Sequence, residues 1–212
     1  MKKFGLVVAL MAAATALSAQ DKSADEYKNE GNEFVRNKQF AEALASYKQA
    51  ITLWGDSVDA ATVYNAGMCA QRTKELDEAY AFYAKAQTLG YKEADAAYRM
   101  ASILKAQKKD DEYAKAIEEG FEKYKNGKTG NAFKKDYAKL FRDQAFGLYN
   151  EGAEITKAMQ TAGADKMDKL KADARAKFSE AKPIIEKSLE INPDDANAKA
   201  IKDSIEKQLE SL

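Results

Sequence analysis

The chain has 212 residues, with 34 basic and 34 acidic side chains, so no net charge favours nucleic acid or an acidic ligand. Histidine is absent and Cys69 is the only cysteine, which excludes histidine-dependent catalytic pairs and multi-thiolate metal sites. With no paired carboxylates and no glycine-rich phosphate loop, the sequence predicts no catalytic residue, cofactor or metal. Abundant alanine, lysine and glutamate, with prolines only at Pro183 and Pro193, predict an all-α protein.

The first twenty residues differ from the rest. Lys2 and Lys3 precede an apolar run over residues 4–17, and small residues follow up to Ala19. This order predicts a signal peptide over residues 1–19, of the Sec type, with cleavage after Ala19. The alternative is an N-terminal membrane anchor, but the run is shorter than the roughly 20 apolar residues of a bilayer span. Without a nearby cysteine for lipidation or a second long apolar stretch, we expect a periplasmic or secreted protein with no membrane span in its mature chain.

An internal repeat follows the leader. In two successive segments a glycine is followed 12, 16 and 19 positions later by alanine, tyrosine and alanine. A third segment keeps the spacing but has the bulky Tyr113 in the place of the first alanine, and the starting points are 36 and 34 residues apart. The matching sets are Gly31, Ala43, Tyr47 and Ala50; Gly67, Ala79, Tyr83 and Ala86; and Ala101, Tyr113, Ile117 and Gly120. Larger apolar residues at helical spacing surround the small ones, and polar turns separate them. Each segment therefore predicts two closely crossing helices, which must stack on their neighbours to bury their apolar faces.

With these residues the chain resembles the tetratricopeptide-repeat (TPR) family. The matching units span about residues 24–57, 60–93 and 94–127. The string Leu189–Asp195, which contains Pro193, is similar to the end of a TPR unit. The resemblance implies an α-solenoid of helical hairpins that forms one domain over residues 20–212.

A fourth, altered unit is predicted over residues 145–194. Ala181 follows Gly152 by 29 residues where the other units have 12, and the added residues, about 156–177, are highly charged. We expect both helices to be extended into a charged hairpin that turns near Thr161–Ala164, with Pro183 inside the second helix, where it could cause a kink. Residues 196–212 are amphipathic and predict a capping helix. Whether residues 128–160 form one helix, or two separated at Gly147, stays open.

The resemblance also implies a concave face, lined mainly by the first helix of each unit, that holds a peptide or a partner helix. The residues expected on it are Lys28, Asn32, Tyr64, Asn65, Arg72, Tyr98 and Arg99. Asparagine supplies both a donor and an acceptor for a peptide backbone, and lysine or arginine can pair with a carboxylate. The alternative is that these side chains are solvated surface, with the asparagines bonding along their own helices.

Some TPR domains clamp the C-terminal carboxylate of a partner with lysine, asparagine and arginine at set positions. The matching positions in this chain are Lys28, Asn32, Asn65 and Arg99, but the fifth is Asp95, which would repel a carboxylate.

Other conspicuous residues have simpler interpretations. Cys69 is expected to be a small packing residue, and Trp54 to pack between hairpins instead of stacking on a ligand. The aromatic residues between Phe133 and Phe146 are expected to be core. The charged hairpin is interpreted as a solvated arm, with docking of a partner or a second copy as the alternative.

The function indicated is a non-enzymatic scaffold or adaptor of the cell envelope that binds a protein or peptide on the concave face. The alternative is a structural component that self-associates through its convex face and long hairpin. Nucleic acid is not expected as a partner. A monomer in solution favours peptide binding, whereas a concentration-dependent oligomer favours assembly.

Overall fold

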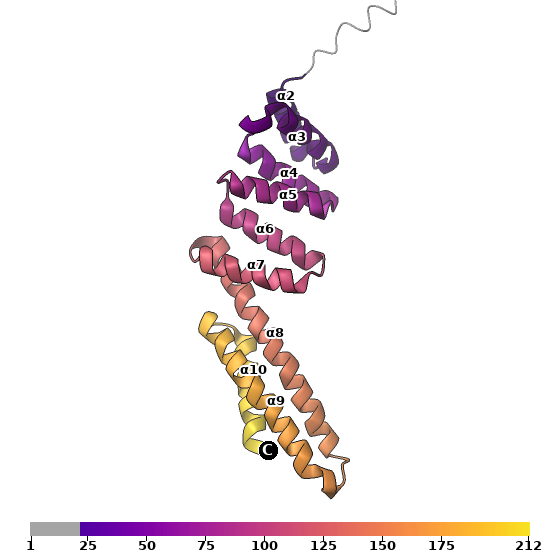
Figure 1. Ribbon diagram of the computed structural model, residues 1–212, viewed down its shortest axis with the longest axis vertical. Coiled ribbons are helices and arrows are strands. Elements are labelled where there is room, and N and C mark those ends of the chain that lie inside the picture. Colours follow the sequence, from indigo (N-terminus) through magenta and orange to yellow (C-terminus); the bar gives the residue numbers. More distant parts are fainter. Residues whose placement is uncertain (1–21) are drawn as a thin grey trace, which may run out of the picture. The chain divides into compact units, whose positions relative to one another are not determined.

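The computed structural model describes residues 22–212, and within them it contains nine α-helices and no strand (Figure 1). The helices, with one short 3-10 turn, are α2 (Ala24–Arg36), α3 (Phe40–Trp54), η1 (Gly55–Ser57), α4 (Ala60–Thr73), α5 (Leu76–Thr88), α6 (Glu93–Ala106), α7 (Asp110–Lys123), α8 (Gly127–Met159), α9 (Ala164–Ile191) and α10 (Ala196–Ser211). The all-α prediction is confirmed. The predicted signal peptide lies outside the described residues.

The chain divides into two compact units, one that ends at Tyr91 and one that begins at Lys92. The first unit holds two hairpins, α2 with α3 and α4 with α5, and α3 also packs against α4. The second unit holds the hairpin of α6 and α7, the long hairpin of α8 and α9, and α10. The single domain predicted over residues 20–212 stays a prediction.

In the first unit, a glycine on the first helix of each hairpin faces an aromatic ring on the second. A Cβ added at Gly31 would lie 2.6 Å from Cε1 of Tyr47, and one at Gly67 would lie 3.1 Å from Cδ1 of Tyr83. Both tyrosines are fully buried. The small residues that recur in the sequence therefore let the two helices of a hairpin approach to the distance at which one ring fills the space between them.

Side-chain oxygens cap the starts of three helices, α2, α4 and α10. The hydroxyl of Ser23 accepts a hydrogen bond from the backbone amide of Glu26, and the carboxylate of Glu26 accepts one from the backbone amide of Ser23. This reciprocal pair is a capping box at the start of α2. The carboxylates of Asp59 and Asp195 accept hydrogen bonds from backbone amides in the first turns of α4 and α10. The start of each of these helices is thus encoded by the residues next to it.

The second unit contains the extended hairpin and the capping helix that the sequence predicts. α8 has 33 residues and α9 has 28, and the chain turns between Met159 and Ala164. α10 runs beside α9, as Figure 1 also shows. The core these three helices share contains Ala145, Ala174, Phe178, Ala181, Ile185, Ala198 and Ile205.

The structure answers the question that the sequence left open about residues 128–160. α8 begins at Gly127 and passes Gly147 without a break. A glycine inside a helix costs roughly 1 kcal/mol relative to alanine. Here α8 packs on α6 and α7 at one end and on α9 along its length, which outweighs that cost. Pro183 lies inside α9 as predicted.

Candidate functional site

The residues predicted to line a binding face lie on the first helices of the hairpins and are divided between the two units. Lys28 and Asn32 are on α2, and Tyr64, Asn65 and Arg72 are on α4, all in the first unit. Tyr98 and Arg99 are on α6, in the second unit.

Two half-buried asparagines, Asn32 and Asn65, were predicted on the first helices of the first unit, and the buried phenol of Tyr47 bonds to the first of them. The hydroxyl of Tyr47, on α3, donates a hydrogen bond of 2.8 Å to Oδ1 of Asn32. Burial raises the pKa of Tyr47 to about 12, and a side-chain hydrogen bond with Asn65 acts in the opposite direction. Both asparagines are half-buried. The amide of Asn32 is therefore oriented by the core, and both asparagines carry hydrogen-bonding groups that a ligand could use.

Lys28, on α2, forms an ion pair with Asp59, the residue that caps the start of α4. Its ammonium lies 3.2 Å from Oδ2 of Asp59 and 5.8 Å from the centroid of the Trp54 ring. Asp59 also accepts hydrogen bonds from the amides of Ala61 and Thr62. Lys28 is thus an ion-paired residue that ties α2 to α4, and Trp54 lies under its ammonium.

The Asp59 cap makes the first unit sensitive to acid. Partial burial acts to raise the pKa of this carboxyl, but hydrogen bonds from Thr62 and Lys28 outweigh it, and the net pKa is lowered. A lowered pKa in the folded state adds stability above the pKa of the unfolded chain, and this is lost as pH falls through the folded value. We expect Asp59→Ala to lower the free energy of unfolding by about 1 kcal/mol at neutral pH.

Thermal unfolding followed by the fluorescence of Trp54, the only tryptophan, checks this prediction. The difference between the Asp59→Ala variant and the unchanged chain should shrink as pH falls below the usual range of an aspartate. Asp56→Ala, in the exposed turn η1, is the control and should change stability by less than about 0.5 kcal/mol. A difference that stays constant with pH would contradict the assignment.

Two other predicted residues of the first unit have different surroundings. Tyr64 is only 2% exposed, with its ring edge-on to those of Tyr83 and Tyr91 at 5.3 and 5.7 Å. It is a core residue and does not line an exposed face, contrary to the prediction. Arg72 is exposed, and its guanidinium lies 5.7 Å from the ring centroid of Phe40, a cation–π contact that leaves its donors accessible.

In the second unit, both predicted residues interact with carboxylates. The hydroxyl of Tyr98 donates to Asp136 over 2.9 Å, and burial followed by this hydrogen bond raises the pKa of Tyr98 to about 12. Nε of Arg99 lies 3.2 Å from Oδ2 of Asp95, one helical turn earlier. Asp95 is the residue whose charge opposes the carboxylate-clamp hypothesis. Lys28 and Arg99, the two cations of that hypothesis, are therefore both paired within the chain.

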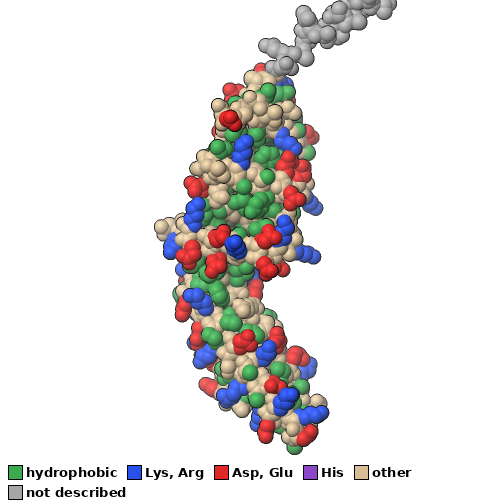
Figure 2. Space-filling view, viewed as in Figure 1, with side chains coloured by type: hydrophobic (Ala, Val, Ile, Leu, Met, Phe, Trp, Pro, Cys, Tyr) green, Lys and Arg blue, Asp and Glu red, His purple; other side chains and the backbone are tan. Residues whose placement is uncertain are grey.

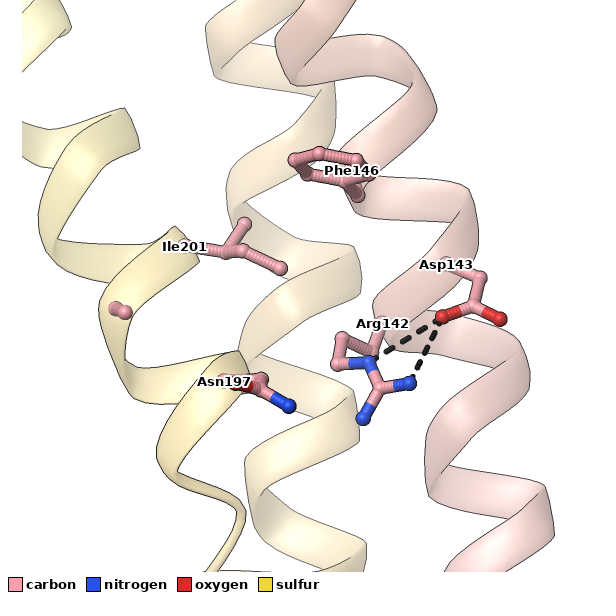
Figure 3. Close-up of a pocket in the computed structure, with 6 residues that line it drawn as sticks. Arg142, Asp143, Phe146, Asn197 and Ile201 are labelled. Carbon is pink, nitrogen blue, oxygen red and sulfur yellow. Dashed lines mark hydrogen bonds and ion pairs between the residues drawn. The ribbon is translucent and has the colours of Figure 1, made fainter.

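A pocket between α8 and α10 was missed by the sequence analysis (Figure 3). It has a volume of about 390 Å³, and Phe146 and Ile201 contribute apolar surface to it. Phe146 is 47% exposed, which corrects the expectation that the whole aromatic run from Phe133 is core, although Phe133 itself is fully buried. Sequence spacing placed Phe146 on an apolar helix, but did not show that α10 leaves its ring uncovered.

The polar side of this pocket is a network of ion pairs. Nη1 of Arg142 lies 2.9 Å from Asp195, and its Nη2 lies 3.1 Å from Asp143, which also pairs with Lys139. Two positive and two negative groups therefore balance one another. The pocket offers an uncharged apolar space beside the exposed amide of Asn197, which suits an apolar side chain of a peptide more than an ion.

Cys69 is a buried packing residue, as the sequence analysis expects. Cys69 is 1% exposed and burial raises the pKa of its thiol to about 11, so the reactive thiolate is scarce at neutral pH. No group of three potential metal ligands occurs in residues 22–212. None of the helices in that range is apolar and long enough for a membrane span. On the face drawn in Figure 2, acidic and basic side chains are interspersed.

Comparison with protein-family models and with curated proteins gave no match. Among solved structures, a TPR repeats protein from Bacteroides fragilis is 21% identical, over 87% of this chain and 98% of its own, with a TM-score of 0.60. A tetratricopeptide repeat protein from Parabacteroides merdae is 14% identical, over 88% of this chain and 73% of its own, with a TM-score of 0.50. YrrB, a TPR protein with an unusual peptide-binding site, is 19% identical over 91% and 98%, with a TM-score of 0.47.

The fold of this chain is therefore that of TPR proteins, an α-solenoid of helical hairpins. The resemblance expected from the small residues and their spacing is confirmed at the level of the fold.

Proposed function

We propose that this chain is a non-enzymatic scaffold that binds a protein or peptide through the exposed side chains of its first helices. The observation that carries the proposal is the pair of half-buried asparagines, Asn32 and Asn65, the first of which accepts a hydrogen bond from the buried hydroxyl of Tyr47. An amide that a buried group already orients, as Tyr47 orients Asn32, loses little entropy when it binds a peptide backbone. Arg72, exposed and resting on Phe40, supplies a nearby positive charge on the same helix as Asn65.

The proposal includes export. The sequence pattern of residues 1–19 supports removal of a signal peptide after Ala19 and a place in the periplasm or outside the cell. N-terminal sequencing of the chain from a periplasmic fraction should return a protein that begins at Gln20. A chain that keeps Met1 and stays with the membrane would favour an anchor instead.

A capture experiment with two matched variants tests the binding face. The mature chain is immobilised and exposed to envelope extract, beside a variant with Asn65→Ala and Arg72→Ala on α4. The control variant carries Gln49→Ala and Lys85→Ala, one amide and one cation on the second helices α3 and α5, both exposed. We expect the α4 variant to bind the captured partner at least about tenfold more weakly, as for a central interface residue, and the control to bind like the unchanged chain.

Two outcomes would count against this face. Equal capture by all three baits would mean that the partner uses another surface. If nothing is captured and the chain sediments as a concentration-dependent oligomer, self-association through the convex face and the long hairpin replaces the proposal. Thermal unfolding of both variants shows whether any loss of binding comes from loss of structure.

A further inference from the structure

A positive charge excess is concentrated where α7 ends and α8 begins. The whole chain has no net charge, yet residues 122–135 contain five lysines and one glutamate. The lysines are Lys123, Lys125, Lys128, Lys134 and Lys135. A run of like charges is often only a solvated face, so a binding role needs a surface on which the lysines act together.

Such a surface is a groove of about 520 Å³ formed by α7, α8 and the end of α9. Its apolar lining consists of Phe121, Tyr137 and Ile191. The rings of Phe121 and Tyr137 are 4.9 Å apart, and the hydroxyl of Tyr137 donates to Glu118 over 2.9 Å, which fixes the ring. The volume is in the range of small-ligand pockets and large enough for a bulky apolar side chain.

Three lysines from three different segments border this groove. Lys125 follows α7, Lys134 is on α8, and Lys187 is on α9. Lys125 pairs with Glu122 at 3.5 Å and Lys187 with Glu190 at 3.4 Å, both within one helical turn and highly exposed. Exposed pairs of this kind contribute little, so their lysines can turn to a ligand. Lys134 has no ion-pair partner among residues 22–212.

We propose that this groove binds an acidic peptide segment in which one apolar side chain is flanked by carboxylates. The apolar side chain packs on Phe121 and Tyr137, and the carboxylates pair with Lys125, Lys134 and Lys187. Glu122 and Glu190 on the rim would repel a dense polyanion such as nucleic acid or an anionic membrane. The separate carboxylates of a peptide can instead reach individual lysines in the space between Glu122 and Glu190. This groove shares no residue with the binding face that contains Asn32, Asn65 and Arg72, and the two proposals are independent.

The test uses the mature chain and a fluorescein-labelled peptide, Glu-Glu-Phe-Glu-Glu. Binding is followed by fluorescence anisotropy at an ionic strength of about 0.01 M, where charges act over about 30 Å. The groove variant carries Lys125→Gln, Lys134→Gln and Lys187→Gln. The control variant removes the same charge from the hairpin arm, with Lys166→Gln, Lys169→Gln and Lys171→Gln, all exposed.

We expect the groove variant to bind the peptide about tenfold more weakly, since three exposed charge pairs together are worth that much, and the control to change affinity less than twofold. The peptide Glu-Glu-Ala-Glu-Glu should bind at least tenfold more weakly than the parent, because the groove then buries no large apolar side chain. The variant with Asn65→Ala and Arg72→Ala should bind the acidic peptide like the unchanged chain, so failure of the first-helix face and failure of this groove are distinguishable.

Three results would overturn the proposal. One is no binding of the phenylalanine peptide at millimolar concentration. Another is an equal loss in the groove and control variants, which would assign binding to overall charge. The third is binding to vesicles that contain an anionic phospholipid with no binding to the peptide, which would make the lysines a membrane-facing patch.

Discussion

Replacing Phe178 with alanine is expected to lower the free energy of unfolding of the second unit by about 3–5 kcal/mol. The ring is fully buried and belongs to the core that joins α8, α9 and α10. It lies over Gly152, where an added Cβ would be 2.8 Å from Cε1, and beside the ring of Tyr149 at 5.7 Å. Because the ring is packed among other buried side chains of α8, α9 and α10, the cavity that it leaves can close only in part.

Circular dichroism and Trp54 fluorescence, measured together, test this prediction. Trp54 is the only tryptophan and lies in the first unit, whereas circular dichroism reports all helices. In chemical denaturation, Phe178→Ala should shift the helical transition of the second unit to lower denaturant and leave the Trp54 transition in place. Phe146→Ala is the control of the same residue type; its ring is 47% exposed, and we expect a loss below about 1 kcal/mol. If both variants lost the same free energy of unfolding, burial of the ring would not determine the effect of its removal.

The second large effect is expected from the addition of a single carbon. Gly120 lies on α7 against the ring of Phe133, which is fully buried on α8, and an added Cβ would overlap that ring. The ring cannot easily move, because it contacts Tyr98 at 5.2 Å edge-on and stacks on Tyr124 at 6.0 Å. Gly120→Ala should therefore lower the free energy of unfolding by about 1–3 kcal/mol, although alanine favours helix.

Gly147→Ala is the matched control, because it is the same substitution inside a helix with open space around it. We expect it to raise the free energy of unfolding by about 1 kcal/mol, the difference in helix propensity between the two residues. Denaturation followed by circular dichroism measures both changes in the free energy of unfolding. Changes of opposite sign at the two glycines would show that the loss at Gly120 comes from packing and not from helix propensity. Phe133→Leu in the Gly120→Ala background should recover part of the loss, since the two residues then no longer overlap. A stabilising Gly120→Ala would contradict the close contact.

Much of the fold could be predicted because the contacts within a hairpin are local. Gly31 and Tyr47 are 16 residues apart, the distance that two helices and a short turn need to bring them together, and Gly67 and Tyr83 repeat that distance. The length of the charged insertion and the glycine at residue 163 likewise indicated a long hairpin and its turn. Such patterns are readable because each repeats a short stretch of chain with its own caps and turns.

The candidate site could be predicted only as a set of positions on helices. Asn32, Asn65 and Arg72 were placed from spacing, and the structure puts them on α2 and α4 as expected. Tyr64 is the immediate neighbour of Asn65, yet its ring is buried against Tyr83 and Tyr91. The sequence also shows the charges of Lys28 and Arg99 but not their pairing, which depends on which carboxylates the folded chain brings near them.

The sequence by itself determined the helices, their pairing into hairpins, and the absence of histidine-based chemistry, since these follow from composition and from residues fewer than about 40 positions apart. Tertiary structure alone decided that α8 passes Gly147 unbroken, that Phe146 lies exposed beside α10, and that Lys125, Lys134 and Lys187 border one groove. These features depend on how α8 packs on α7, α9 and α10. The packing of helices distant in sequence depends on the shapes of whole side-chain surfaces, and no short spacing encodes it.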